Sequence, residues 1–188
     1  MLTMGSVDIG VKYLAITVFD PITNIIIYWN IHTVCEVNGS FSQSISSLMT
    51  QALPFMTDTV VIVIEKQIRC CSRSFQRNGM NNCRVEAGVE QFFINMKPDA
   101  RTLTINSRYK LLKHGVDMSN IVLKQSLKTQ SVQICKQFLE LNIQHVDIHN
   151  FFNNHRKKDD LSDCLLQALA YYNMNVSSFP RFIRAAEE

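Results

Sequence analysis

The sequence predicts an α/β fold in which a mixed central β-sheet is flanked by α-helices. Two observations support this fold class. The first third of the chain holds three short β-rich runs, and the remainder mixes helical patterns with further β-rich runs. Antiparallel strands followed by helix–strand units give a mixed sheet covered by helices. A chain of 188 residues is long enough for one domain with a sizeable core, so we expect a single domain over residues 1–188.

Strand predictions come first in chain order. Two β-rich runs flank Gly10, where a hairpin turn is expected, and Asp20-Pro21 supplies the turn before a third run. These three runs predict an antiparallel meander. The run T-V-V-I-V-I is apolar throughout, as in a strand buried on both faces. The five expected strands cover residues 7–9, 13–19, 25–32, 59–64 and 102–105.

Apolar residues at helical spacing predict the helices, and Pro54 marks the end of the first of them. A further turn or two of helix is expected at residues 107–113. The stretch 66–82 is polar, basic and without periodicity, so we predict a loop or flexible arm there. The four main predicted helices cover residues 40–53, 83–96, 127–141 and 159–174.

Composition excludes several classes of protein. Hydrophobic residues make up 46% and charged residues 19% of the chain, which is a globular rather than a disordered balance. The apolar runs are far shorter than the ~20 residues of a membrane span, and no signal peptide is visible. We therefore expect a cytoplasmic or nuclear protein that is neither secreted nor bound to a membrane. The six cysteines contain no CxxC pair, which indicates free thiols rather than a zinc ribbon.

Charge is distributed unevenly along the chain. The net charge is only +3, and the first 65 residues contain a single basic residue, Lys12. The next stretch is basic and holds no acid: Lys66, Arg69, Arg73, Arg77 and Arg84. A basic middle on a nearly neutral chain indicates a surface that binds a polyanion.

Acidic residues occupy three unusual places. Asp8 lies within an apolar run, Glu65 follows the apolar run at 59–64, and Asp159, Asp160 and Asp163 cluster at the start of the last predicted helix. Each has an ordinary explanation as a turn former, a strand end, or a charge favoured at a helix N-terminus. Charges are nevertheless costly to desolvate unless something pairs with them. Mg²⁺ or Mn²⁺ would do so, because these ions prefer hard oxygen ligands.

Helix geometry limits which aspartates act together. Positions three or four apart share one helix face, so Asp163 can point to one centre with either Asp159 or Asp160. If the strands carrying Asp8 and Glu65 are neighbours, four carboxylates can converge. Two metal ions about 3.5–4 Å apart would then support phosphodiester hydrolysis.

Three segments resemble a known family. They are S-V-D-I-G at 6–10, I-V-I-E-K-Q at 62–67 and K-K-D-D-L-S-D-C-L-L-Q-A-L at 157–169. Together they look like the RuvC-type Holliday junction resolvases of the RNase H-like superfamily, and most like the branch in poxviruses and other large DNA viruses. The resemblance implies an RNase H-like fold and a structure-selective endodeoxyribonuclease that resolves four-way DNA junctions.

The resemblance also implies roles for individual residues. The metal ligands would be Asp8, Glu65, Asp160 and Asp163, with two Mg²⁺ ions that Mn²⁺ can replace. The D-x-x-D spacing selects Asp160 as the ligand that acts with Asp163. Asp159 is then a candidate only for the outer shell of the metal site. Lys128 looks similar to a basic catalytic residue that the family carries on the helix before the last one. Lys124 is its nearest rival, and an ordinary solvated lysine is the alternative for Lys128.

DNA binding is expected in the arm after Glu65. Phe75 would stack on or wedge between bases while basic neighbours hold phosphates, or it would simply pack into the core. The helix at 83–96 would serve as a homodimer face, as the family implies, or would only pack on the sheet. A two-fold dimer matches the symmetry of a four-way junction. The expected DNA-binding residues are Lys66, Arg69, Arg73, Phe75 and Arg77.

Three other functions fit parts of the sequence. Another RNase H-like nuclease would act on branched DNA or RNA–DNA hybrids. An actin-like ATP-binding fragment is suggested by D-I-G-V-K, but the six glycines form no second phosphate loop, so we expect no nucleotide cofactor. A non-catalytic DNA-binding protein would not need all four acids.

Overall fold

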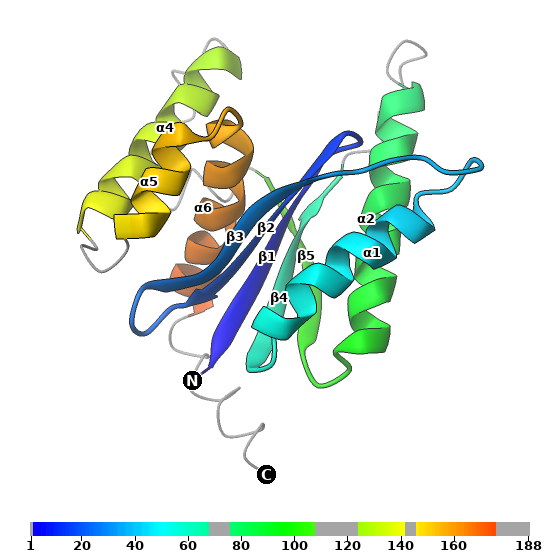
Figure 1. Ribbon diagram of the computed structural model, residues 1–188, viewed down its shortest axis with the longest axis horizontal. Helices are drawn as coiled ribbons and strands as arrows, with labels where there is room; N and C mark the ends of the chain where they lie inside the picture. Colours follow the sequence, from blue (N-terminus) through cyan, green and yellow to red (C-terminus); the bar gives the residue numbers. More distant parts are fainter. Residues whose placement is uncertain (1, 68–75, 108–123, 142–145, 176–188) are drawn as a thin grey trace.

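A computed structural model gives the structure of the protein and describes residues 2–67, 76–107, 124–141 and 146–175; the description of side chains excludes residues 76–78, 124–126 and 146. A five-stranded sheet lies between two groups of helices (Figure 1). The strand order is β3-β2-β1-β4-β5. The strands are β1 (Thr3–Ile9), β2 (Tyr13–Asp20), β3 (Ile25–Thr33), β4 (Thr59–Lys66) and β5 (Arg101–Asn106).

The first three strands form the predicted antiparallel meander. β1 pairs with β2 and β2 pairs with β3, both antiparallel. Gly10 is required at the first turn, because a Cβ there would lie 2.5 Å from the backbone oxygen of Tyr13. In the second turn, the Asp20 carboxylate accepts hydrogen bonds from the backbone N–H of Ile22 at 2.9 Å and the hydroxyl of Thr23.

The other two strands run parallel to β1. β4 pairs with β1 and β5 pairs with β4, so strands far apart in sequence become neighbours. The sheet is therefore mixed and flanked by helices, which confirms the predicted fold class. Because β1 and β4 are parallel and adjacent, their C-terminal ends meet at one edge of the sheet.

Two helices cover one face of the sheet. They are α1 (Ser42–Ala52), which continues into the short 3₁₀ turn η1 (Leu53–Phe55), and α2 (Gln76–Met96). Their buried side chains pack with alternate residues of the strands, including Val7, Ile16 and Ile64. The helical spacing of apolar residues in α2 predicts an inward stripe of Val85, Val89, Phe92, Phe93 and Met96. Val85, Val89 and Phe93 are fully buried, whereas Met96 is 52% exposed, so the stripe is confirmed only in part.

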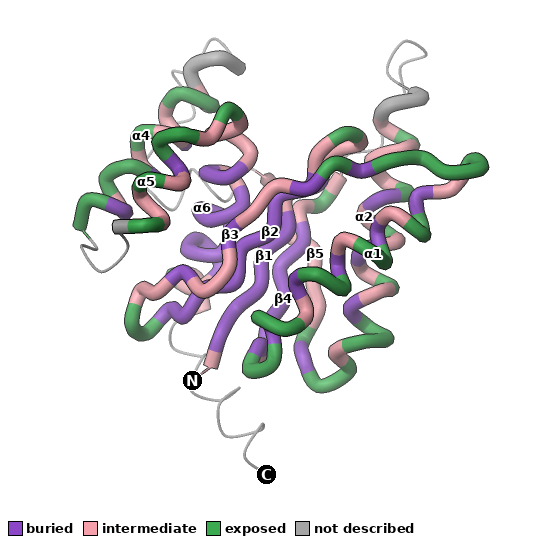
Figure 2. Tube along the Cα trace, viewed as in Figure 1, coloured by how far each residue is buried: buried purple, intermediate pink, exposed green. Residues whose placement is uncertain are grey.

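Three helices cover the other face: α4 (Lys124–Leu141), α5 (Val146–Asn154) and α6 (Lys158–Asn175). α6 contacts β1 and β2 on one side and α4 on the other. It is consequently buried almost all round from Leu161 to Tyr171, as the burial colouring in Figure 2 shows. α5 lies over β3, where Phe152 stacks on Trp29 with ring centroids 5.2 Å apart.

Two predictions were wrong in part. Residues 76–82 of the predicted arm are the first turns of α2, and Lys66 is the last residue of β4. α5 was not predicted at all. Because α5 lies between α4 and α6 in the chain, Lys128 is not on the helix immediately before the last one, as expected, but on the one before that. The predicted helix at 107–113 lies almost wholly outside the described residues, as does the arm at 68–75. Among the helices that the structure describes, none is long and apolar enough to cross a membrane.

Candidate active site

Asp8 and Glu65 lie at the C-terminal ends of the two central strands. Val7 pairs in register with Ile64, and both pack into the core beneath α1 and α2. Side chains alternate between the two faces of a strand, so the next residues, Asp8 and Glu65, project from the opposite face, which α6 covers. Strand alternation and parallel pairing thus bring two carboxylates that are distant in sequence to the same face and edge of the sheet.

α6 brings the three aspartates of the predicted cluster to this edge. Asp159 and Asp160 are in its first turn, and Asp163 follows in the next. The helix is fixed against the sheet by Gln167, which is fully buried and donates its amide N–H groups to the backbone oxygens of Val7 and Val63 at 3.3 and 3.2 Å. These are carbonyls of the two strands that carry Asp8 and Glu65.

A buried thiol completes the attachment of α6. Cys164 donates to the backbone oxygens of Ser6 at 3.0 Å and Ala15 at 3.3 Å. Burial raises the pKa of this thiol to about 12, so it stays protonated and able to donate. The first turns of α6 therefore hold a fixed position relative to Asp8.

Asp8 and Asp160 line one pocket of about 500 Å³. Burial, and then the negative charge of Asp159, raise the pKa of Asp160, while Lys157 acts in the opposite direction with its ammonium 3.6 Å from the carboxylate. A divalent cation would relieve this unfavourable ionisation. The pocket is lined by Asp8, Ile9, Gly10, Val11, Lys12, Tyr13, Asn82, Lys157 and Asp160.

Asp159 has a different partner, the ammonium of Lys128 on α4. Burial alone would raise the pKa of Asp159, but the hydrogen bond and positive charge of Lys128 outweigh it, so that pKa is lowered. The pKa of Lys128 is raised chiefly by the same hydrogen bond, and the charges of Asp160 and Asp163 add to the effect. Lys128 therefore lies beside the aspartate cluster, with its side chain 60% exposed.

A polar network that we did not predict surrounds Glu65. The Gln67 side chain donates to a Glu65 carboxylate oxygen at 3.0 Å, and Asn82 donates to the Gln67 side-chain oxygen at 3.1 Å. Because Asn82 also lines the pocket of Asp8 and Asp160, the network connects Glu65 to that pocket. Asn82 lies four positions before Glu86, on the same helix face, and this spacing was the sequence signal for the network. It was missed because residues 76–82 were expected to form a loop.

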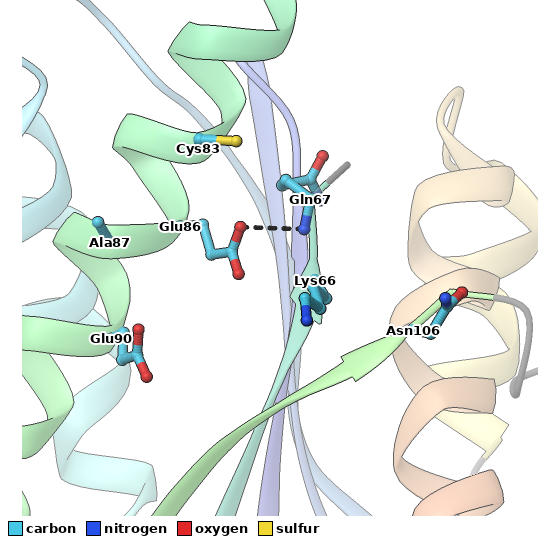
Figure 3. A pocket seen from close by; sticks show the side chains of 7 residues that line it. All are labelled: Lys66, Gln67, Cys83, Glu86, Ala87, Glu90 and Asn106. Atoms are coloured by element: carbon cyan, nitrogen blue, oxygen red, sulfur yellow. Dashed lines mark hydrogen bonds between the residues drawn. The ribbon is translucent and has the colours of Figure 1, made fainter. Parts of the chain in front are cut away.

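A second pocket of about 530 Å³ lies between the end of β4 and α2. Figure 3 shows Glu86 directed toward Gln67, whose backbone N–H it accepts at 2.9 Å. Burial raises the pKa of Glu86, and the Gln67 hydrogen bond opposes that effect. This pocket is lined by Lys66, Gln67, Cys83, Glu86, Ala87, Glu90 and Asn106.

Most of the predicted DNA-binding residues lie outside the described part of the chain. Lys66 is described, and it is exposed at the end of β4. Arg69, Arg73 and Phe75 fall in the undescribed stretch, and Arg77 is in the first turn of α2 without a described side chain. The side chain of Lys124, the rival of Lys128, is likewise outside the description.

The donor chemistry at this edge of the sheet fits Mg²⁺. Asp8 and Asp160 offer carboxylate oxygens to a shared pocket, and hard oxygen donors are what this ion binds. Over the described residues, no three or more His, Cys, Asp or Glu side chains are grouped so that they could hold a metal ion. The described conformation thus presents the Asp8–Asp160 pair, while Glu65 lies at the end of β4 and Asp163 in the second turn of α6.

Comparison with known proteins identifies the fold. No protein-family model and no curated protein matches the chain. Among solved structures, Thermus thermophilus RuvC in complex with a Holliday junction substrate matches with a TM-score of 0.58 and 9% identity, over 93% of this chain and 96% of that one. Another structure of Thermus thermophilus RuvC matches with a TM-score of 0.58 and 10% identity, over 93% and 97%.

The yeast mitochondrial Holliday junction resolvase Ydc2 also matches, with a TM-score of 0.59 and 16% identity, over 97% of this chain and 83% of that one. These similarities span nearly the whole chain and include the mixed five-stranded sheet. The protein therefore has the RNase H-like fold of the RuvC-type resolvases.

Proposed function

We propose that this protein is a metal-dependent endodeoxyribonuclease that resolves four-way DNA junctions by paired hydrolytic incisions. The observation that supports it most is the pocket shared by Asp8 and Asp160, at the edge of the sheet where β1 and β4 end. The fold adds support, because the similar solved structures are of proteins named as Holliday junction resolvases or bound to a junction.

Each acid of the proposed site has a role as a metal ligand. Asp8, Glu65, Asp160 and Asp163 would hold two Mg²⁺ ions, for which Mn²⁺ can substitute. When bound, these ions would supply an activated water and stabilise charge on the phosphate. Gln67 orients the Glu65 carboxylate through its hydrogen bond. Lys128 neutralises Asp159 and places a positive charge beside the aspartates, where it would stabilise the phosphate in the transition state.

The arm after β4 would hold the junction. Lys66, Arg69, Arg73 and Arg77 would bind phosphates, and Phe75 would stack on or wedge between bases. Kinship with the poxvirus and large DNA virus enzymes is the finer part of this proposal, and it rests on the three sequence motifs. It implies that the protein acts in the cytoplasm or nucleus, wherever viral DNA is processed.

Substitution of the acids tests the catalytic assignment. Asp8→Asn and Asp163→Asn should abolish cleavage of a four-way junction in Mg²⁺ while junction binding in EDTA survives. Asp147→Asn, at an exposed acid of α5, is the matched control and should cleave like the wild type. Full activity in either site variant would contradict the assignment.

Substrate choice separates junction resolution from other nuclease activities. Initial cleavage rates should be compared on a four-way junction, a flap, a linear duplex and an RNA–DNA hybrid of matched sequence. The proposal predicts fastest cleavage of the junction, by symmetric cuts in two strands. Preference for the hybrid or the flap would instead favour another RNase H-like nuclease.

A further inference from the structure

A cluster of two lysines and a tyrosine forms the rim of the pocket that contains Asp8 and Asp160. Lys12, Tyr13 and Lys157 all line this pocket. The ammonium of Lys157 lies 4.9 Å from the centre of the Tyr13 ring, and that of Lys12 lies 5.4 Å from the same centre. Two cations from different parts of the chain, the β1–β2 turn and the start of α6, therefore share one aromatic ring.

The backbone holds this cluster in place. Gly10 permits the close turn against the backbone of Tyr13. The backbone oxygen of Lys12 accepts a hydrogen bond from Val34 N–H at 2.9 Å, and Tyr13 pairs in register with Thr33. The position of the ring relative to Asp8 is consequently set by the sheet.

The positive charges of the cluster favour binding of an anion. Lys157 has a carboxylate partner, Asp160, whereas Lys12 forms no ion pair with any described residue and its side chain is exposed. Lys12 therefore adds an exposed positive charge at the rim of the pocket, and a negatively charged ligand beside it would be attracted to that charge. If Asp160 binds a metal ion, Lys157 also loses part of its attraction to that carboxylate.

We propose that Lys12, Tyr13 and Lys157 form a subsite for the sugar-phosphate backbone of the cleaved DNA strand, next to the scissile phosphate. This inference rests on the proposed function and adds to it the position of a substrate contact. Because the cations already contact the Tyr13 ring, the subsite binds phosphate rather than stacking on a base. The contact is therefore independent of DNA sequence.

Lys12→Gln tests the subsite without altering any of the acids. Binding of the full chain to a four-way junction should be measured in EDTA over a range of salt concentrations. Loss of one phosphate contact should weaken binding several-fold and reduce the slope of log K against log salt by about 0.9. Lys136→Gln removes the same charge from an exposed position on α4 and is the matched control. Thermal melting of both variants checks their folding.

Neutral phosphates locate the contact on the DNA. Methylphosphonate linkages are placed one at a time around the cut site, and one of them should weaken binding by the wild type. That penalty should vanish in Lys12→Gln but persist in Lys136→Gln. Tyr13→Phe keeps the ring and should bind like the wild type, whereas Tyr13→Leu should resemble Lys12→Gln.

Either of two results would overturn the subsite: equal salt slopes for Lys12→Gln and Lys136→Gln, or an unchanged methylphosphonate penalty in Lys12→Gln. Failure of the proposed nuclease function is a separate observation. It would appear as no cleavage of any branched DNA by the wild type in Mg²⁺ or Mn²⁺, while the binding measurements in EDTA would still judge the subsite.

Discussion

Gln167 shows how a single buried polar residue sets the geometry of a site that it does not enter. Its amide bridges carbonyls of β1 and β4, just before the residues at which these strands carry Asp8 and Glu65. Its own side-chain oxygen is buried and has no hydrogen-bond partner among the described residues. The net stabilisation is therefore less than two full hydrogen bonds, since an unsatisfied buried acceptor has a cost.

We predict that Gln167→Leu lowers stability modestly and metal affinity more clearly. The substitution leaves two buried carbonyls without this donor but also removes the unsatisfied oxygen, so the expected loss is about 1 kcal/mol in the free energy of unfolding. Mn²⁺ binding measured by calorimetry should weaken because Asp8 and Glu65 are held less firmly. Gln137→Leu, on the exposed side of α4, is the control. Unchanged Mn²⁺ affinity would contradict a positioning role.

His32 predicts a dependence of stability on pH that is separate from the site. It is buried on β3, and its ring nitrogen pairs with the Tyr28 hydroxyl at 2.7 Å. Burial lowers the pKa of His32, so the folded state binds fewer protons than the unfolded state at mildly acid pH. The contribution of His32 is intact above the ordinary histidine pKa of about 6.5 and is lost as pH falls through the lowered value.

Urea unfolding at a series of pH values measures this effect. The free energy of unfolding should fall between about pH 7 and pH 5 in the wild type, and the fall should be smaller in His32→Gln. His155→Gln is a control at a less buried histidine. Identical profiles for the wild type and His32→Gln would show that another group causes the loss.

Among single residues, charge in apolar surroundings was the signal that the sequence offered. Asp8 and Glu65 were recognisable because each interrupts or ends an apolar strand. Gln67, Asn82 and Gln167 were not, because uncharged polar residues in helices and near strand ends are common. Only strand pairing and helix packing reveal which of them are buried beside the acids.

At the scale of elements, the helices and strands with a strong apolar periodicity were predicted correctly, whereas short or polar helical segments were missed. The meander, β4 and α6 follow from apolar alternation, an apolar run and a helical stripe. α5 has only nine residues and three asparagines, so its helical pattern is weak without Trp29 to pack against. The first turns of α2 carry almost no apolar residues, which is why sequence periodicity missed them.

The docking of α5 on β3 should contribute strongly to stability. Phe152 is fully buried and its ring lies nearly parallel to that of Trp29, with an interplanar angle of 4°. We predict that Phe152→Ala lowers the free energy of unfolding by about 3–5 kcal/mol. Phe55→Ala, at a partly exposed phenylalanine of η1, should cost less. Chemical denaturation measures both, and equal losses would contradict the proposed docking.

At the scale of the whole molecule, α2 has one face on the sheet and one face outward (Figure 2). Its buried positions are Val85, Val89 and Phe93. Met80, Ala87 and Ile94 recur at intervals of seven on the exposed side, where Met80 is 65% and Ile94 is 50% exposed. An exposed apolar repeat of this kind favours the expectation, drawn from the family resemblance, that α2 is the homodimer face.

We predict that Ile94→Glu converts a dimer into a monomer, because it places a charge in the exposed apolar repeat of the expected interface. Met96→Glu is the matched control, since Met96 is 52% exposed on the same helix but two residues away, on a different side. Size-exclusion chromatography with light scattering measures the mass. A wild-type monomer at micromolar concentration, or dissociation by both variants alike, would argue against this face.

The order of the strands has a consequence for protein synthesis. The ribosome delivers Asp8 first, then Glu65, and Asp160 only after roughly 5–20 s more of translation. Since α6 lies against β1 and β2 and supplies the last acids, a nascent chain that ends before α6 lacks half of the proposed metal ligands. The proposed site is therefore incomplete on the ribosome until the sheet and its final covering helix have come together.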